Sequence, residues 1–184
     1  MRDDELIAQI RCGNEQAAQE LIKRYYTSVL RYCKWHCSNM EEAEDLTQET
    51  FFKLFKNLPQ YDEKKKFKAY LYTIANRLCI DESRKKQLYP LEDEEHIADE
   101  YSEIHRIDDK EEVDYFLRLL SPEQKDAVIL RFGEQLSYSE IAKVMGCNMR
   151  TAQSRVRNAL KVMREERRHE RAENANQNKS GSAK

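Results

Sequence analysis

The scarcity of glycine and proline is the feature that most restricts the fold of this chain. The 184 residues include only 4 glycines and 3 prolines, whereas an average protein has roughly 12% of the two together. Sandwiches and barrels need turns rich in these residues after every short strand. The composition therefore argues against an all-β fold and predicts helices. No stretch approaches the length of uncharged apolar sequence that a membrane span requires.

The small net charge of −2 hides a division of the chain into three parts. Residues 1–87 carry 16 basic and 14 acidic side chains, and residues 113–184 carry 14 basic and 9 acidic ones. Residues 88–112, between them, carry 2 basic and 11 acidic side chains. Two mildly basic modules thus flank an acidic connector, and nucleic-acid binding depends on such local charge.

Residues 1–87 show apolar positions at helical spacing throughout. Asn14 is placed to cap a long helix, and Asn39 with Glu42 forms a capping box before a second helix. Pro59 ends that second helix, because the residue before a proline avoids helical geometry. A lysine-rich loop and a third helix follow. We expect this first module to be a small helical domain.

The connector, residues 88–112, lacks any apolar period and contains Pro90. A sequence of this composition is typical of a flexible acidic linker. A short helix near Ile104 remains compatible with the pattern.

The second module, residues 113–168, opens with a strong helix start. Ser121 is placed as N-cap, with proline at the first helical position and Gln124 at the third. A second capping box begins at Ser137. Residues 169–184 are polar and without pattern, and we expect them to be disordered.

Residues 137–164 have the pattern of a helix-turn-helix. Two steeply crossing helices need a small residue where they touch and a tight turn between them, and Ala142 and Gly146 provide these. Ala152 and Val156 keep a narrow apolar stripe on the second helix, so its other face is able to enter the major groove. Arg150, Arg155 and Arg157 are placed to meet phosphates, and Gln153, Ser154 and Asn158 to reach base edges.

The chain shows no arrangement typical of catalysis or of a bound cofactor. Its five cysteines are an odd number, and the N-terminal sequence lacks an apolar signal core, which predicts free thiols and a cytoplasmic location. The group Cys33, His36 and Cys37 invites a zinc interpretation, but a fourth ligand is not evident and the cysteines fall on an apolar stripe. We expect a non-enzyme without cofactor or metal.

The sequence resembles bacterial RNA polymerase sigma factors of the extracytoplasmic-function (ECF) group, in the sigma-70 family. Residues 45–51, DLTQETF, and 55–58, FKNL, resemble the second conserved region of that group. Residues 66–86 resemble the promoter-melting segment, and residues 120–160 the fourth conserved region. The resemblance covers about residues 5–168 in the right order and spacing. It implies an all-α chain of two small helical domains joined by the linker, with the helix-turn-helix in the second.

The resemblance also implies which residues carry the function. The surface that docks on the clamp helices of the largest polymerase subunit matches Asp45, Gln48, Glu49, Phe52 and Lys53. The part that reads and opens the −10 element matches the loop 57–66 and the next helix, with Tyr61, Lys64, Lys65, Lys66, Asn76, Arg77, Asp81, Arg84 and Lys85. The part that reads the −35 element matches Arg150, Thr151, Gln153, Ser154, Arg155, Arg157 and Asn158.

The partners implied are core RNA polymerase (clamp helices and flap), promoter DNA and an anti-sigma factor able to hold the protein at the membrane. No small-molecule substrate is implied. Two alternatives from other classes stay open. One is a stand-alone transcription regulator that shares the helix-turn-helix, and the other is an interaction protein that uses the basic helix to bind acidic proteins. A salt-sensitive, sequence-specific footprint separates the last from the others.

Overall fold

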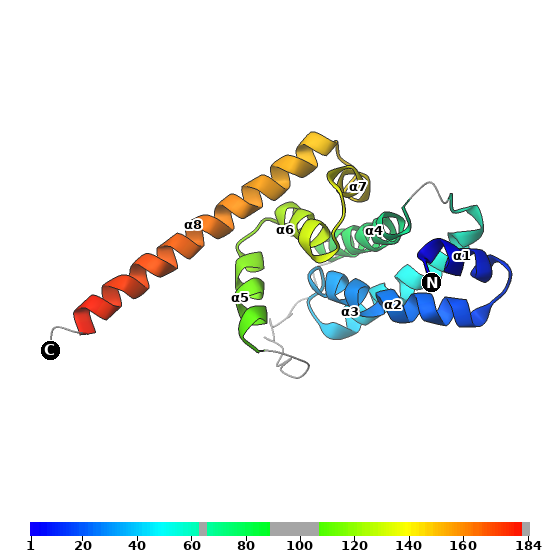
Figure 1. Ribbon diagram of the computed structural model, residues 1–184, viewed down its shortest axis with the longest axis horizontal. Helices are drawn as coiled ribbons and strands as arrows, with labels where there is room; N and C mark the ends of the chain where they lie inside the picture. Colours follow the sequence, from blue (N-terminus) through cyan, green and yellow to red (C-terminus); the bar gives the residue numbers. More distant parts are fainter. Residues whose placement is uncertain (63–65, 89–106, 182–184) are drawn as a thin grey trace. The chain divides into compact units, whose positions relative to one another are not determined.

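The computed structural model describes residues 1–62, 66–88 and 107–181. Within these residues it contains eight α-helices, two short turns of other helix types and no strand. The chain divides into two compact units, residues 1–101 with 140–146 and residues 102–139 with 147–184. The prediction of an all-α chain with two helical domains is confirmed (Figure 1).

The first unit is built around α2 (Glu15–Lys34), which packs against α1 (Asp3–Arg11), α3 (Met40–Asn57) and α4 (Phe67–Leu88). A 3-10 turn, η1 (Leu58–Gln60), follows α3. The core consists of side chains with relative exposures of 0–2%, among them Leu6, Ile7, Leu21, Val29, Leu54, Leu58 and Leu71. Leu21, Val29, Leu54, Leu58 and Leu71 lie on apolar stripes that helical periodicity predicts, and Leu6 and Ile7 of α1 add to this core.

The helix starts in this unit follow the predicted caps with one difference. The Asn14 side chain accepts a hydrogen bond from the Ala17 amide (3.2 Å), and Asn39 accepts one from the Glu42 amide (2.8 Å). The Glu42 carboxylate, however, accepts from the Ser38 amide (3.1 Å). The carboxylate thus reaches one residue further back than the capping box predicts, and it still satisfies an amide at the helix start.

Residues 89–106, most of the predicted acidic linker, lie outside the described residues. Its last residues, 107–112, already belong to α5 (Ile107–Arg118). The buried side chains of Phe116 and Leu117 anchor this helix. Residues 107–112 are therefore helical, although their charge pattern alone assigns them to the linker.

The second unit pairs α6 (Pro122–Val128) with α8 (Met149–Gly181). The predicted capping box at Ser121 is present, because Ser121 accepts from the Gln124 amide (3.3 Å) and Gln124 accepts from the Ser121 amide (3.1 Å). A wide helical turn, η2 (Ile129–Gly133), extends α6. Leu130, Ala152, Val156 and Ala159, each at most 1% exposed, form part of its core.

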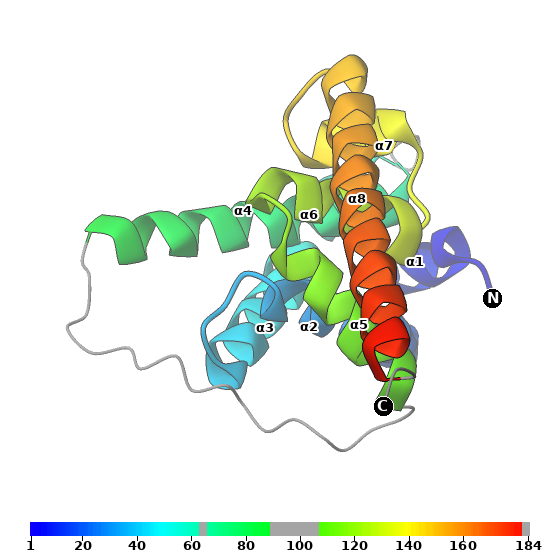
Figure 2. The same ribbon diagram turned by 90° about the vertical axis from the view of Figure 1, so that its left-hand side faces the viewer.

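Helix α8 continues to Gly181, whereas the sequence predicts no regular structure after residue 168. Three contacts, made by Glu166 and Arg167, tie its middle to α5. The Tyr115 hydroxyl lies 2.5 Å from a Glu166 carboxylate oxygen, and Arg167 pairs with Glu112 and lies over the Phe116 ring. No glycine or proline interrupts the helix before its last residue. Figure 2 shows α8 running past α5 as one continuous helix.

Candidate nucleic-acid and polymerase interfaces

The first turns of α8 present a polar face that local sequence fully determines. The Asn148 carboxamide oxygen accepts hydrogen bonds from the Thr151 amide (2.8 Å) and hydroxyl (3.0 Å), which fixes the helix start. Ala152, Val156 and Ala159 are buried, so the opposite side of the helix faces outward. Of the predicted −35 residues, the exposed ones are Arg150, Gln153, Arg157 and Asn158.

The remaining three predicted −35 residues, Thr151, Ser154 and Arg155, are half-buried. They line a hollow of about 310 Å³ between the starts of α6 and α8, together with Asn158, Ser121, Glu123 and Gln124. Arg150, Gln153 and Arg157 thus face outward, whereas Thr151, Ser154 and Arg155 lie beside the start of α6. Asn158 is exposed and also borders the hollow. Such a division suits separate contacts to base edges and to the sugar-phosphate backbone.

A second set of predicted residues follows one side of α4. Arg77, Asp81, Arg84 and Lys85 are spaced four, three and one residues apart and are all exposed. Lys85 pairs with Glu82 (2.9 Å), and this hydrogen bond holds the pKa of Lys85 above its ordinary value. Three of these four side chains are basic, which suits contact with a nucleic-acid backbone.

Two residues predicted for −10 contacts are buried instead. Asn76 is 3% exposed, accepts a hydrogen bond from the Tyr32 hydroxyl (3.0 Å) and donates one to the Val144 carbonyl (3.0 Å) within the first unit. Tyr61 is 5% exposed, with its ring 4.9 Å from that of Tyr70 and 6.1 Å from that of Phe67. In this structure both side chains belong to the core, where a DNA base does not reach them.

The other loop residues of the −10 set are the three lysines. Lys64 and Lys65 lie outside the described residues. Lys66 is exposed, and its ammonium nitrogen lies 3.4 Å from Glu140. Tyr70 is the half-buried member of the aromatic group that it forms with Tyr61 and Phe67.

The outer face of α3 carries all five residues predicted to bind polymerase. Asp45, Gln48 and Phe52 are exposed, Phe52 to 61%, while Glu49 and Lys53 are half-buried and form an ion pair of 3.5 Å. A largely exposed phenylalanine among charged side chains is the composition of a protein interface with an apolar centre and a charged rim.

The cysteines show the burial that the apolar stripe predicts. All five are free thiols; Cys33 and Cys79 are buried, and Cys37 is half-buried. Burial raises the pKa of the Cys37 thiol to about 12, so it stays protonated at neutral pH. No cluster of three or more metal-ligating side chains occurs in the described part of the chain.

Sequence reasoning missed three contacts that shape these surfaces. The Asn148 cap has a readable signal, since an asparagine precedes Thr151 by three residues at a helix start. The pairing of Tyr115 with Glu166 joins residues 51 positions apart. The bonds from Arg11 to carbonyls near residue 60 span 47 and 50 positions. No local pattern indicates either of these long-range contacts.

No helix of the described residues combines the length and the hydropathy needed to span a membrane.

Two family models match this chain. The model for sigma-70 region 2 matches residues 21–89, and the model for sigma-70 region 4 matches residues 110–163. The first contains α3 and α4, and the second contains α6, α7 (Tyr138–Val144) and the start of α8. Both predicted DNA-contacting surfaces and the predicted polymerase-binding surface thus fall inside matched segments.

Two similar proteins align with this chain along most of their length. The ECF RNA polymerase sigma factor SigW of Bacillus subtilis is 25% identical over 175 residues, which are 87% of this chain and 94% of that protein. The probable RNA polymerase sigma-C factor of Mycobacterium bovis is 30% identical over 151 residues, 80% of this chain and 81% of that protein.

A solved structure agrees with the sequence comparisons. The sigma factor RpoE of Bartonella quintana, solved with the anti-sigma factor NepR, matches with a TM-score of 0.66 and 25% identity. The match covers 80% of this chain and 94% of that one. The chain therefore belongs to the ECF group of the sigma-70 family, and it is an alternative sigma factor that directs promoter recognition and transcription initiation.

Proposed function

We propose that three surfaces of this sigma factor divide the work of initiation. The outer face of α3 docks on the clamp helices of core RNA polymerase. The basic side of α4, with the preceding loop, binds the −10 element. The start of α8 reads the −35 element. The polymerase performs the chemistry, so the protein itself is not an enzyme and needs no cofactor.

The observation that carries this proposal is the exposed face at the start of α8. Arg150, Gln153, Arg157 and Asn158 point away from a stripe of buried small residues, on a helix whose first turn is fixed by Asn148. Arginine, glutamine and asparagine are the side chains that make paired hydrogen bonds to guanine and adenine edges in the major groove. This face therefore supplies both phosphate contacts and base readout.

The −10 element is bound through a different kind of contact, because the DNA there is single-stranded. An unpaired strand is held by positive charge along its backbone and by contacts to extruded bases. Arg77, Arg84 and Lys85 supply the charge on one side of α4. Tyr70, which retains partial exposure, is the aromatic side chain next to the loop that suits base stacking.

The acidic connector sets the distance between the two DNA-reading surfaces. Tethering to one polymerase raises the effective concentration of each surface for its element, so neither needs high affinity alone. Negative charge over residues 88–112 also suits a path along the positively charged channel of the polymerase.

Control by an anti-sigma factor is the last part of the proposal. Two similar proteins, Bartonella quintana RpoE and CnrH, have been solved with NepR and with the cytosolic domain of CnrY. We propose that a partner of this kind covers the same surfaces here. An anti-sigma factor anchored in the membrane holds the protein at the membrane. After release, the protein acts in the cytoplasm.

The test is run-off transcription with purified core polymerase on a set of promoter fragments, with and without this protein. Initiation that depends on the protein and occurs at fragments sharing −35 and −10 motifs supports the proposal. Specific duplex binding without initiation favours a stand-alone regulator. Absence of both contradicts promoter recognition by this chain.

A further inference from the structure

Helix α1 lies outside the segment that matches the region 2 model, which begins at Leu21. It is nevertheless a firmly packed part of the first unit. Leu6 and Ile7 are fully buried, and α1 packs against α2 and η1. Residues before the matched segment therefore contribute to the structure around the loop.

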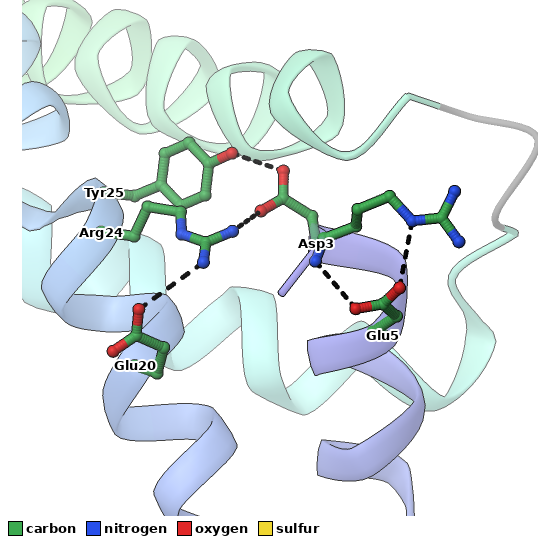
Figure 3. A network of polar contacts seen from close by, with 6 residues as sticks. Asp3, Glu5, Glu20, Arg24 and Tyr25 are labelled. Carbon is green, nitrogen blue, oxygen red and sulfur yellow. Dashed lines mark hydrogen bonds and ion pairs between the residues drawn. The ribbon is translucent and has the colours of Figure 1, made fainter.

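A polar network fixes the position of α1 on α2 (Figure 3). The Asp3 carboxylate accepts hydrogen bonds from Arg24 (2.7 Å) and from the Tyr25 hydroxyl (2.5 Å). Arg24 also pairs with Glu20 (3.5 Å), as Figure 3 shows. With apolar packing along its length and a polar anchor at its first turn, α1 is held rigidly.

The other end of α1 reaches the loop. The Arg11 guanidinium donates to the Leu58 carbonyl from two nitrogens, each at 3.3 Å, and to the Tyr61 carbonyl. These carbonyls mark the two ends of the turn between α3 and the loop. A guanidinium offers five donors in a fixed fork, so it is able to hold two carbonyls at a set separation.

The Tyr61 side chain holds the same stretch of backbone, residues 58–61, by packing into the core. Its ring is buried against Phe67 at the start of α4, and Phe67 in turn lies 5.5 Å from the ring of Tyr25. Tyr25 is the residue that bonds Asp3 of α1. The backbone at residues 58–61 is thus held by Arg11 on one side and by an aromatic cluster on the other.

We infer that Arg11 is a positioning residue for −10 recognition, because it fixes the backbone from which the reading loop departs. This inference rests on the −10 role proposed above for the loop and α4. Arg11 touches no DNA in this account. It acts through the carbonyls of Leu58 and Tyr61. By holding Tyr61, whose ring packs against Tyr70, Arg11 sets how precisely Tyr70 at the start of α4 is presented to an extruded base.

The test compares promoters that differ by one base in the −10 element, transcribed by holoenzyme at saturating sigma factor. The expected result for Arg11→Ala is a loss of about fivefold or more in discrimination between the bases, because several charge-assisted hydrogen bonds are removed. Arg11→Lys keeps the charge but lacks the forked guanidinium. Its −10 discrimination is expected to lie between those of wild type and Arg11→Ala. Discrimination at the −35 element is unchanged in both.

Arg2→Ala is the matched control, since Arg2 is on the same segment and its side chain pairs with the nearby Glu5 (3.1 Å). It is expected to behave as wild type. Circular dichroism melting of each variant shows that the chain is folded, and Arg11→Lys carries the test if Arg11→Ala does not fold. Gln60→Ala, an exposed change in the turn itself, reports on the loop directly.

Two results overturn the inference in distinguishable ways. If Gln60→Ala reduces −10 discrimination while both Arg11 variants match wild type, the loop reads the element but Arg11 does not position it. If neither the Gln60 nor the Arg11 variants change −10 discrimination, the proposed role of the loop is wrong and the inference falls with it. Equal losses at −10 and −35 would show a general defect in folding and also contradict it.

Discussion

The start of α8 and the loop–α4 surface were both predicted as DNA contacts, yet their side chains are placed by different means. On α8 the predicted residues are exposed or line one hollow beside α6. On the loop and α4 two of the predicted residues, Tyr61 and Asn76, are in the core. A surface made by one helix follows its sequence period, whereas a surface made by a loop and a buried helix depends on packing from elsewhere.

The largest effect is expected from a charge reversal on the DNA-reading face of α8. Arg157→Glu removes a donor and adds repulsion from phosphates, so initiation at a promoter with an intact −35 element should fall about 100-fold. Binding to core polymerase should not change. Initiation rates on promoters with intact and scrambled −35 elements measure the effect.

Arg164→Glu is the control for that change, because Arg164 lies two turns further along the same helix and is exposed. It should leave discrimination at −35 almost unchanged. If Arg157→Glu keeps its −35 discrimination, the groove assignment of α8 is wrong.

The next effect concerns the loop–α4 surface and separates its buried residues from its exposed ones. Asn76→Ala removes the buried hydrogen bonds that Asn76 makes with the Tyr32 hydroxyl and the Val144 carbonyl, which should lower the free energy of unfolding by about 1–3 kcal/mol. Arg77→Ala, at the exposed neighbour, should change it by less than about 0.5 kcal/mol. Urea denaturation of both variants gives the two values, and equal values would remove the distinction between core and surface here.

A smaller effect concerns the α3 face, which is again a single-helix surface. Phe52→Ala should weaken binding to core polymerase about tenfold, because a largely exposed aromatic at an interface centre contributes through burial on binding. Promoter discrimination should be preserved. Gln19→Ala, an exposed change on α2, is the control in a titration of labelled sigma factor with core enzyme. Equal affinities for the two variants would place the interface elsewhere.

The smallest effect is a pH dependence. Burial raises the pKa of Cys37 from its ordinary value to about 12, so the folded state keeps a proton that the unfolded state loses. Its contribution to stability is complete below the ordinary pKa and is lost as pH rises toward 12. Thermal melting from pH 8 to 11 should show a shallower decline in Cys37→Ala than in wild type. Identical slopes would contradict the assigned shift.

Local sequence patterns account for most of the fold and about half of the candidate surfaces. The caps at Asn14 and Ser121, and the exposed residues at the start of α8, follow from short-range spacing. The bonds made by Arg11 do not, because they join parts of the chain 47 and 50 positions apart. Burial of Tyr61 depends on the packing of its ring against Phe67 and Tyr70, which no apolar period predicts. The continuation of α8 from residue 169 to Gly181 was also missed, because a polar segment without an apolar period gives no helical signal.

The most direct test of the central claim is transcription from a library in which the −35 and −10 elements are randomised independently, with core polymerase and either wild type or Arg157→Glu. The account predicts that wild-type transcripts carry sequence information at both elements and that Arg157→Glu loses it at −35 alone. Loss of information at both elements together, or none at either with wild type, would contradict the division of promoter reading between α8 and the loop–α4 surface.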